Sequence, residues 1–271
     1  MCLVALALGR SAHFPFVLAS NRDEFYERPA APLAWWAPDP GSAPILAGRD
    51  LQGGGTWLGL SATGRLGLVT NVRDPARHDP QARSRGELVT RWLAGHEDFE
   101  QLWAACEPTA YNGFNLVAAD LRLGRAHWAS NATGATQPLQ AGVYGLSNAA
   151  LDTPWPKTAA LKARLAQALA FESFEPLAEA LFEALADRRA ALDEALPSTG
   201  VPLALERELS PAFIRTADGR YGTRCSTLVV VERTPGEADT VHVVEHRHDA
   251  APGEPPRRHE RLGLPRVGAA S

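Results

Sequence analysis

The sequence has few cysteines, and their spacing does not suggest a stabilising framework. Its 271 residues include three cysteines, Cys2, Cys106 and Cys225, which are scattered along the chain without a CxxC pair. An odd number at these spacings argues against a disulfide framework and against a structural zinc knuckle. We therefore expect a protein of a reducing compartment.

Long apolar runs and an excess of positive charge are also missing. No stretch approaches the roughly 18 to 20 apolar residues that span a bilayer. The opening run 2–8 lacks the basic segment that precedes the apolar part of a signal peptide. The net charge of −4 gives no electrostatic reason to bind nucleic acid or an anionic membrane. We expect a soluble, cytoplasmic protein with a small-molecule ligand or substrate, no nucleic-acid partner and no integral membrane segment.

The chain is long enough for one large domain. With 45% hydrophobic residues, we take residues 1–271 as a single domain with a large core. Apolar patterns predict strands at 2–8, 14–19, 57–60, 66–72, 114–118, 126–129, 143–147, 224–232 and 240–246. Helical spacing predicts helices near 84–93, 99–106, 157–170 and 175–188. Strand-rich blocks with inserted helix pairs predict an α+β fold in which packed sheets are covered by helices.

Three local features refine this prediction. Ser84-Arg85-Gly86-Glu87 fits a capping box at the start of the first helix. Cys106 continues the apolar spacing of the second helix, so we expect it on a buried helical face. The tail from about residue 250 is rich in Pro, Arg and Glu, and we expect it to be loosely ordered.

Cys2 is the first candidate for chemistry. A small residue after the initiator methionine normally allows Met1 to be removed, which would leave a cysteine with a free α-amine. Such an amine has a pKa of about 7.7 to 8 and can accept the thiol proton near neutral pH. We expect a thiol in this setting to have a pKa below its ordinary value and to react faster than Cys106 or Cys225. The alternative is that Cys2 is an apolar residue that opens a strand.

Residues 20–29, SNRDEFYERP, place an amide, two guanidinium groups and several carboxylates directly after an apolar strand. Strand residues alternate between faces, so Asn21 and Asp23 would point one way, and Arg22 and Glu24 the other. If this strand pairs with the first, Asp23 can accept a hydrogen bond from the Cys2 amine. Arg22 then needs an anion of its own, and the candidates are Glu24, Glu27 and Asp50. The alternative is a salt-bridged strand end before a turn.

Asn71 lies where another strand ends. Its amide N–H is a neutral donor, suited to negative charge that develops on a carbonyl oxygen. The alternative is an asparagine that caps the turn before Asp74-Pro75. Upstream, Gly53-Gly54-Gly55 would let backbone approach a ligand or serve a mobile loop, and we expect a flap beside the pocket.

Three histidines raise the question of a metal or haem site. His242, His246 and His248 are separated by even numbers of residues and would share one face of a strand. The interleaved Glu245 and Arg247 favour an alternating, solvated edge instead, so we predict no metal site.

These motifs carry a family resemblance. The chain resembles the NRDE family, which includes the transport and Golgi organization proteins. The matching segments are Met1-Cys2, residues 21–25 with Arg28-Pro29, residues 48–50, residues 53–59, residues 70–73 and residues 84–88. The match is densest over residues 1–93 and continues more thinly through residues 144–148 and 221–227.

The NRDE family is similar in turn to the N-terminal nucleophile hydrolases of the choloylglycine hydrolase and penicillin V acylase branch. This resemblance implies a four-layer αββα sandwich of two mainly antiparallel sheets and cleavage of amides by an N-terminal cysteine. The implied catalytic residues are the nucleophile Cys2, the carboxylate Asp23, the oxyanion donor Asn71, the substrate-side Asn148 and the late-strand Arg224. In the hydrolases a first-strand arginine precedes the aspartate by three positions, which here is Ser20, whereas Arg22 is adjacent to Asp23.

Two functions follow from the motifs and the resemblance. The first is a hydrolase that needs no cofactor and acts on an amide or thioester bond of a small molecule. The second is a non-catalytic carrier of haem or another hydrophobic ligand on the same fold, because eukaryotic members of the family are linked to haem handling and Golgi organisation. The expected ligand-binding residues are Asn21, Arg22, Arg49, Asp50, Gly54, Trp57 and Arg73.

Overall fold

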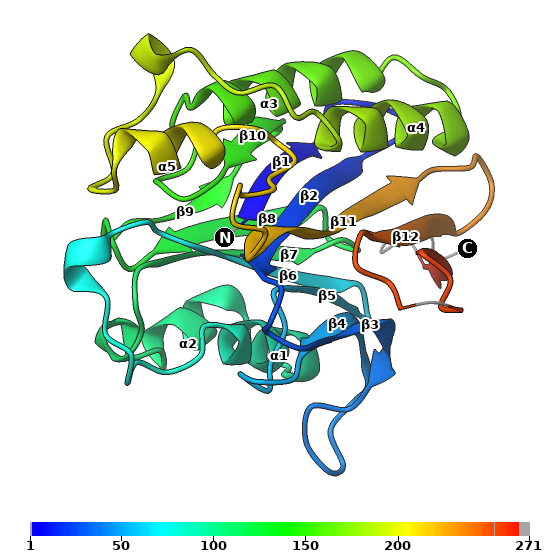
Figure 1. The fold of residues 1–271 in the computed structure, drawn as a ribbon. Coiled ribbons are helices and arrows are strands. Elements are labelled where there is room, and N and C mark those ends of the chain that lie inside the picture. Colours follow the sequence, from blue (N-terminus) through cyan, green and yellow to red (C-terminus); the bar gives the residue numbers. More distant parts are fainter. Residues whose placement is uncertain (1, 252, 266–271) are drawn as a thin grey trace.

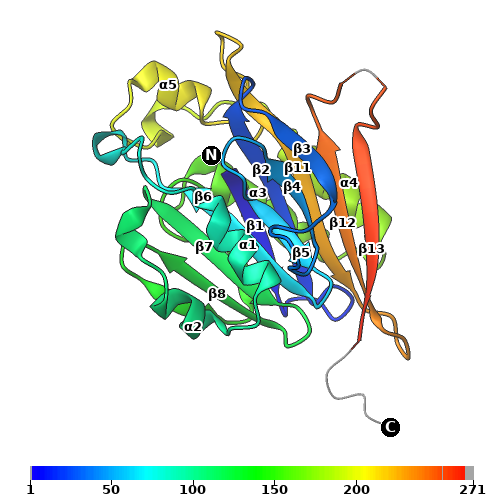
Figure 2. The same cartoon turned by 90° about the horizontal axis from the view of Figure 1, so that it is seen from below.

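The computed structural model describes residues 2–251 and 253–265. Within them, six strands form an antiparallel sheet in the order β10-β1-β2-β11-β12-β13, which we call the cysteine sheet. Its strands are β1 (Cys2–Leu8), β2 (Phe16–Phe25), β10 (Gly142–Leu146), β11 (Tyr221–Glu232), β12 (Asp239–Arg247) and β13 (Arg257–Leu264). The strand that carries Cys2 therefore has a neighbour on each side, β10 and β2 (Figure 1). Figure 2 shows the other end of this sheet, where β12 and β13 lie side by side.

The second sheet is built from one continuous part of the chain, and we call it the meander sheet. Over the described residues its order is β3-β4-β5-β6-β7-β8-β9, so each strand pairs with the next along the sequence. The strands are β3 (Ala30–Trp36), β4 (Ile45–Asp50), β5 (Leu58–Ser61), β6 (Arg65–Asn71), β7 (Phe114–Asp120), β8 (Arg125–Ser130) and β9 (Thr136–Leu139).

Helices cover the outer face of each sheet (Figure 1). The pair α1 (Gly86–Ala94) and α2 (Phe99–Ala104) packs on the meander sheet, and the pair α3 (Pro156–Ala168) and α4 (Phe174–Leu185) on the cysteine sheet. A short helix, α5 (Leu203–Glu208), follows this second pair. The predicted α+β class and the four-layer αββα arrangement are confirmed.

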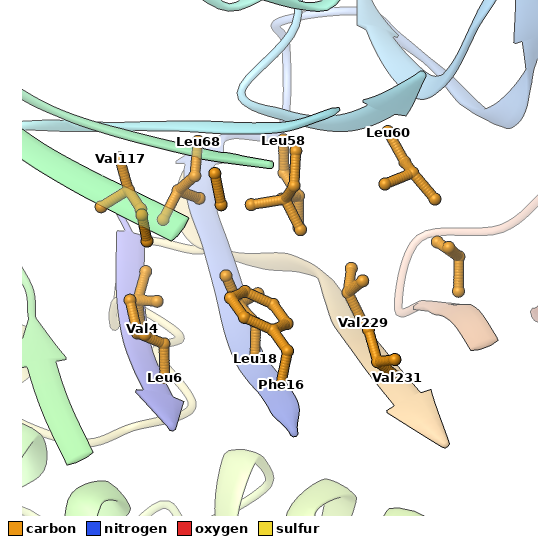
Figure 3. Packing of buried hydrophobic residues seen from close by; sticks show 14 of the residues in the cluster. Val4, Leu6, Phe16, Leu18, Leu58, Leu60, Leu68, Val117, Val229 and Val231 are labelled. Atoms are coloured by element: carbon orange, nitrogen blue, oxygen red, sulfur yellow. The ribbon is translucent and has the colours of Figure 1, made fainter. Parts of the chain in front are cut away.

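The core explains why β1 and β2 are apolar on both faces. Val4 and Leu6 of β1 and Leu18 of β2 point between the sheets, where they meet residues of β5, β6 and β7 (Figure 3). The alternate residues, such as Leu3 and Val17, point toward α3 and α4. Burying each such leucine or valine stabilises the fold by about 1.5–3 kcal/mol. Both strands are thus fixed between two apolar layers.

Every predicted strand and helix is present, with ends that differ by a few residues, but β3, β4, β9, β13 and α5 were not predicted. The expectation of a loosely ordered tail is wrong for Arg257–Leu264, which pairs with β12 as the edge strand β13. Consequently β12 is not a solvated edge, and Glu245 is buried.

Two finer predictions are also wrong. The capping box at Ser84 does not form, because the Glu87 side chain instead binds Arg83 and accepts a hydrogen bond from the Tyr111 hydroxyl. A capping box does form at α2, between Asp98 and Gln101. Cys106 lies just beyond the end of α2 and is only half-buried. In the described part of the chain, no helix has the length and apolar character needed to cross a membrane.

Candidate active site

Cys2 lies directly opposite Arg22 in the β1–β2 ladder. Residues that face each other in a ladder project from the same side of the sheet, and here that side faces the meander sheet. The Cys2 side chain is 5% exposed. Pairing of β2 with β11 places Cys225 opposite Arg22 on its other side. The adjacency of the first two strands, on which the interpretation of residues 20–29 depended, is confirmed.

Arg22 is held between carboxylates and an indole. Its Nη2 lies 3.9 Å from an oxygen of Glu24 and 3.7 Å from one of Asp50. Its guanidinium carbon is 4.3 Å from the centre of the Trp57 ring, which is cation–π geometry. Two of the three anticipated anions are therefore beside Arg22. The buried Nη1 has no hydrogen-bond partner among the residues that the structure describes.

A polar cavity of about 460 Å³ opens beside these residues. It lies where the ends of β1, β2 and β6 meet the loop after β4 and the start of α1. Of the residues expected to be catalytic or to bind a ligand, those that line it are Cys2, Arg22, Asp23, Asp50, Trp57 and Asn71. The sequence analysis assigned no role at the site to Arg85 or Asn112, which also line it. Arg28 lines it as well and donates to Asp50 at 2.8 Å.

Asp23 lies beside Arg22 but belongs to the opposite face of β2, as alternation predicts. It is fully buried and accepts a hydrogen bond of 2.7 Å from the Thr223 hydroxyl. Burial raises the pKa of its carboxyl group, and the nearby positive charge of Lys157 opposes that rise. Lys157 is a buried residue of α3 that the sequence did not mark as functional, because it lies in a helix far along the chain.

Asn71 and Asn148 are tied to each other. Asn148 is buried, and its Nδ2 donates to the Asn71 carbonyl oxygen at 2.9 Å. The neighbouring Ser147 hydroxyl donates to the Cys2 carbonyl at 3.1 Å. The segment after β10 thereby fixes the backbone of both Cys2 and Asn71. Asn148 thus binds the backbone of Asn71, and Asn71 lines the cavity whereas Asn148 does not.

Six of the residues expected at the site do not line the cavity, namely Asn21, Arg49, Gly54, Arg73, Asn148 and Arg224. The Asn21 amide donates to the carbonyls of Leu185 and Ala212, both at 2.8 Å, since it faces the helical layer. Arg49 lies over the Trp36 ring, because alternation turns it away from its neighbour Asp50. Arg73 is in a buried ion pair with Glu206. Arg224 binds Asp249 and the carbonyls of Phe25 and Arg28.

Arg224 differs from the expectation because β11 is irregular at this point. The ladder with β2 skips from Thr223 to Cys225, so Arg224 is the bulged residue.

Gly54 has a φ of +81°, which glycine adopts without strain, and its neighbour Gly53 lines the cavity. The carboxylate of Asp50 accepts the N–H of Gly53 at 2.9 Å, so this glycine loop is anchored to the site.

The expected depression of the Cys2 thiol pKa is wrong for the thiol in its buried position. Burial raises its pKa and outweighs the lowering effect of Arg22. Burial also raises the pKa of Cys106 and, to a greater extent, that of Cys225. Any activation of Cys2 therefore has to come from a base beside it.

The histidines of β12 pack against the helical layer. His242 stacks on Phe174 at 4.0 Å between ring centres, and it shares hydrogen bonds with His259 and Glu232. Among residues 2–251 and 253–265, no group of three or more His, Cys, Asp or Glu side chains could hold a metal ion.

Comparison with known proteins identifies relatives across most of the chain. Residues 1–250 match the family model described as Transport and Golgi organisation 2. The chain is similar to the Transport and Golgi organization 2 homologues of Mus musculus and Homo sapiens, each 35% identical over 232 residues that cover 81% of this chain and 83% of the relative. Among solved structures, a C2A mutant of a conjugated bile acid hydrolase from Clostridium perfringens aligns over 98% of both chains with 8% identity and a TM-score of 0.45.

Proposed function

Because this chain belongs to the Transport and Golgi organisation 2 family and has a cysteine at the head of a strand beside a polar cavity, we propose that it is a cysteine-dependent hydrolase of an amide or thioester bond in a small molecule. The observation that carries the proposal is that Cys2, Arg22 and Asn71, from three strands, line one cavity. Its volume lies within the usual range for small-molecule sites, about 300–1,000 Å³.

The proposed reaction begins with removal of Met1, which frees the α-amine of Cys2. This amine takes the thiol proton, and the sulfur attacks the substrate carbonyl carbon. The Asn71 amide donates a hydrogen bond to the negatively charged oxygen that forms. The amine then returns the proton to the leaving nitrogen or sulfur as the bond to carbon breaks. Water hydrolyses the resulting acyl-cysteine, which releases the acid and restores the thiol.

Arg22 and Asp23 have separate parts in this proposal. Arg22 lies on the thiol side of the strand and favours the thiolate when it forms. Asp23 lies on the other side, next to the start of β1, where its carboxylate can orient the Cys2 amine. The arginine needs no strand irregularity to reach the thiol face, because the ladder already aligns it with Cys2. We also propose a cytoplasmic location, since a catalytic thiol has to stay reduced.

The test is a screen of wild-type protein and Cys2→Ala against N-acyl amides, acyl thioesters and haemin. The hydrolase proposal expects product from wild-type protein and none from Cys2→Ala, while the substrate affinity changes little. Trp57→Ala is the matched variant, since it alters a wall of the cavity without removing the nucleophile. Saturable haemin binding, with no product from any amide or thioester, would instead support a carrier.

A further inference from the structure

One arginine of the polar cavity beside Cys2 differs from the others in what balances its charge. Arg85 is the N-cap residue of α1, and its half-buried side chain lines this cavity. Its Nη1 donates a long hydrogen bond of 3.3 Å to the Gly113 carbonyl. In the described part of the chain, no carboxylate forms an ion pair with Arg85. A neutral carbonyl oxygen does not balance the charge of a guanidinium group.

The other arginines that line the cavity have carboxylate partners. Arg22 and Arg28 share the carboxylates at the ends of β2 and β4, with 2.8 Å between Arg28 Nε and Asp50. Arg83 pairs with Glu87 at 2.7 Å. These carboxylates are therefore already engaged by cations other than Arg85.

Two further carboxylates line the cavity but are directed elsewhere. Asp23 accepts the Thr223 hydroxyl on the other face of β2. Asp79 is exposed and accepts the Gln81 N–H at 2.8 Å. Neither forms an ion pair with Arg85, so its positive charge is available to a ligand in the cavity.

The surroundings of Arg85 disfavour its charge. Burial lowers the pKa of its guanidinium group, against the opposing effect of Glu24. The positive end of the α1 dipole also disfavours a cation at this position. Since a partly buried cation is costly without an anion, an anion from outside the chain would stabilise this part of the fold.

Backbone contacts hold Arg85 at the cavity. The Thr56 N–H donates to the Gly86 carbonyl at 3.4 Å. This close approach requires glycine on both sides. A Cβ atom on Gly55 would lie 2.5 Å from the Gly86 carbonyl carbon, and one on Gly86 would lie 3.0 Å from the Thr56 nitrogen. The start of α1 is thus fixed against the loop after β4, which lines the same cavity.

We propose that Arg85 binds a carboxylate group of the substrate, so that the preferred substrates of the Cys2 site are amides or thioesters that carry a free carboxylate. The ligand's being a substrate rests on the proposed hydrolase function, whereas the preference for a carboxylate does not. A guanidinium group matches a carboxylate with two parallel hydrogen bonds. One unbalanced positive charge also suits the single charge of a carboxylate better than the charge of about −1.5 to −2 on a phosphate monoester.

Probe pairs that differ in one charge test this substrate class. Glutaryl para-nitroanilide and its carboxamide place the difference on the acyl side of the amide bond. N-butanoyl-para-aminobenzoate and its carboxamide place it on the amine side. Calorimetric titration of Cys2→Ala, which lacks the nucleophile, should show that the carboxylate of one pair binds about tenfold tighter, or more, than its carboxamide. The pair that shows the preference identifies the side.

Arg85→Gln, combined with Cys2→Ala, should make the two affinities of that pair nearly equal. It should unfold at no lower urea concentration than Cys2→Ala alone, because no ion pair is lost. Arg91→Gln is the matched control and should keep the preference. It removes a charge from the same helix, but Arg91 lies outside the cavity and pairs with Glu97 at 2.8 Å.

Three binding results would overturn the proposal: equal affinities within both pairs, no binding of any probe, or a preference that survives Arg85→Gln. Turnover by wild-type protein is decided separately. Equal kcat/KM for carboxylate and carboxamide would keep the hydrolase function and overturn the substrate class. If no probe yields product while Cys2→Ala still prefers the carboxylate, the hydrolase proposal loses support and the role of Arg85 in binding stands.

Discussion

Cys2 and Arg22 face each other across the β1–β2 ladder, and both lie on the side of the cysteine sheet that meets the meander sheet. This relationship joins the second residue of the chain to the central charged group of the NRDE motif. It also puts a cation where a thiolate would form. The surrounding carboxylates and the Trp57 ring fix the direction of that cation.

Replacing Arg22 should destabilise the fold. Arg22→Met removes a guanidinium group from a side chain that is only 5% exposed. Glu24 and Asp50 then lose the ion pairs that they form with it. We expect a loss of about 1–3 kcal/mol in the free energy of unfolding, since breaking a buried charge pair costs more than breaking an exposed one. Urea denaturation measures this loss. Arg28→Met is the control, because Arg28 also pairs with Asp50 but is 30% exposed. Equal losses for both variants would contradict the prediction.

Removal of Met1 is the simplest prediction of the nucleophile hypothesis. Intact-mass measurement should show a chain that begins at Cys2. Cys2→Ala should also lose Met1, because its second residue is small too. A wild-type chain that keeps Met1 would lack the free amine, and the proposed base would then be absent.

Asn71 should affect the chemical step more than binding. If its side chain donates to the oxyanion, Asn71→Ala should lower kcat by about 10²–10³-fold with little change in KM. Steady-state kinetics on a substrate from the screen measures both. Asn112→Ala is the matched control, since Asn112 lines the same cavity while its side chain bonds Asp79. A large effect on KM alone would assign Asn71 to ground-state binding.

The three thiols should react in the order of their exposure when Cys2 has no free amine. A chain with an N-terminal tag keeps the Cys2 nitrogen as an amide. In that chain, limiting iodoacetamide should label the half-buried Cys106 first and the buried Cys225 last, because burial raises the Cys225 pKa most clearly. Peptide mass spectrometry gives the order. Faster reaction of Cys2 than Cys106 in the tagged chain would show that the amine is not its activator.

The negative charge of ionised Glu245 should lower the free energy of unfolding at neutral pH. It is 2% exposed and accepts the Leu33 N–H at 2.8 Å, which links β12 to β3. Burial raises its pKa against the opposing effect of Arg247 and Arg258. A folded pKa above the unfolded value gives stability at acid pH that is lost as the pH rises through the folded pKa. Glu245→Gln keeps a carbonyl acceptor without the charge.

We therefore expect Glu245→Gln to be more stable than wild-type protein at pH 7, with a difference that shrinks toward about pH 4, near the ordinary glutamic acid pKa. Urea unfolding at both pH values measures the difference. A variant that is less stable at pH 7 would show that the ionised form is the one that the fold favours.

The sequence was sufficient for the parts of the fold that depend on apolar periodicity. The strands of the core and the helices α1 to α4 follow from it, because their buried residues recur at the spacing of the element. The edge strand β13 does not. Its sequence, RRHERLGL, is largely polar, and its extended form depends on pairing with β12. Likewise, β3 contains a proline, and its ladder with β4 is irregular.

The site was predictable where it depends on strand alternation. The opposite faces of Arg22 and Asp23, and the location of Glu24 on the same face as Arg22, follow from a period of two. The surroundings of Lys157, Arg73 and Arg224 do not follow from local pattern. The partners of Lys157 and Arg73 come from segments more than 50 residues away, and a bulge redirects Arg224.

The strand order of the two sheets bears on how the chain is completed during synthesis. The meander sheet occupies residues 30–139 without interruption, so all of its partners emerge from the ribosome in succession. By contrast, β1 and β2 are made first, but they pair with β10 and β11, and β11 begins only at Tyr221. Until then the β2 edge of the N-terminal hairpin has no partner strand. A chain that stops before β11 would therefore expose an unpaired strand edge beside an otherwise complete meander sheet, and Arg22, which faces Cys2, would lack its second neighbouring strand.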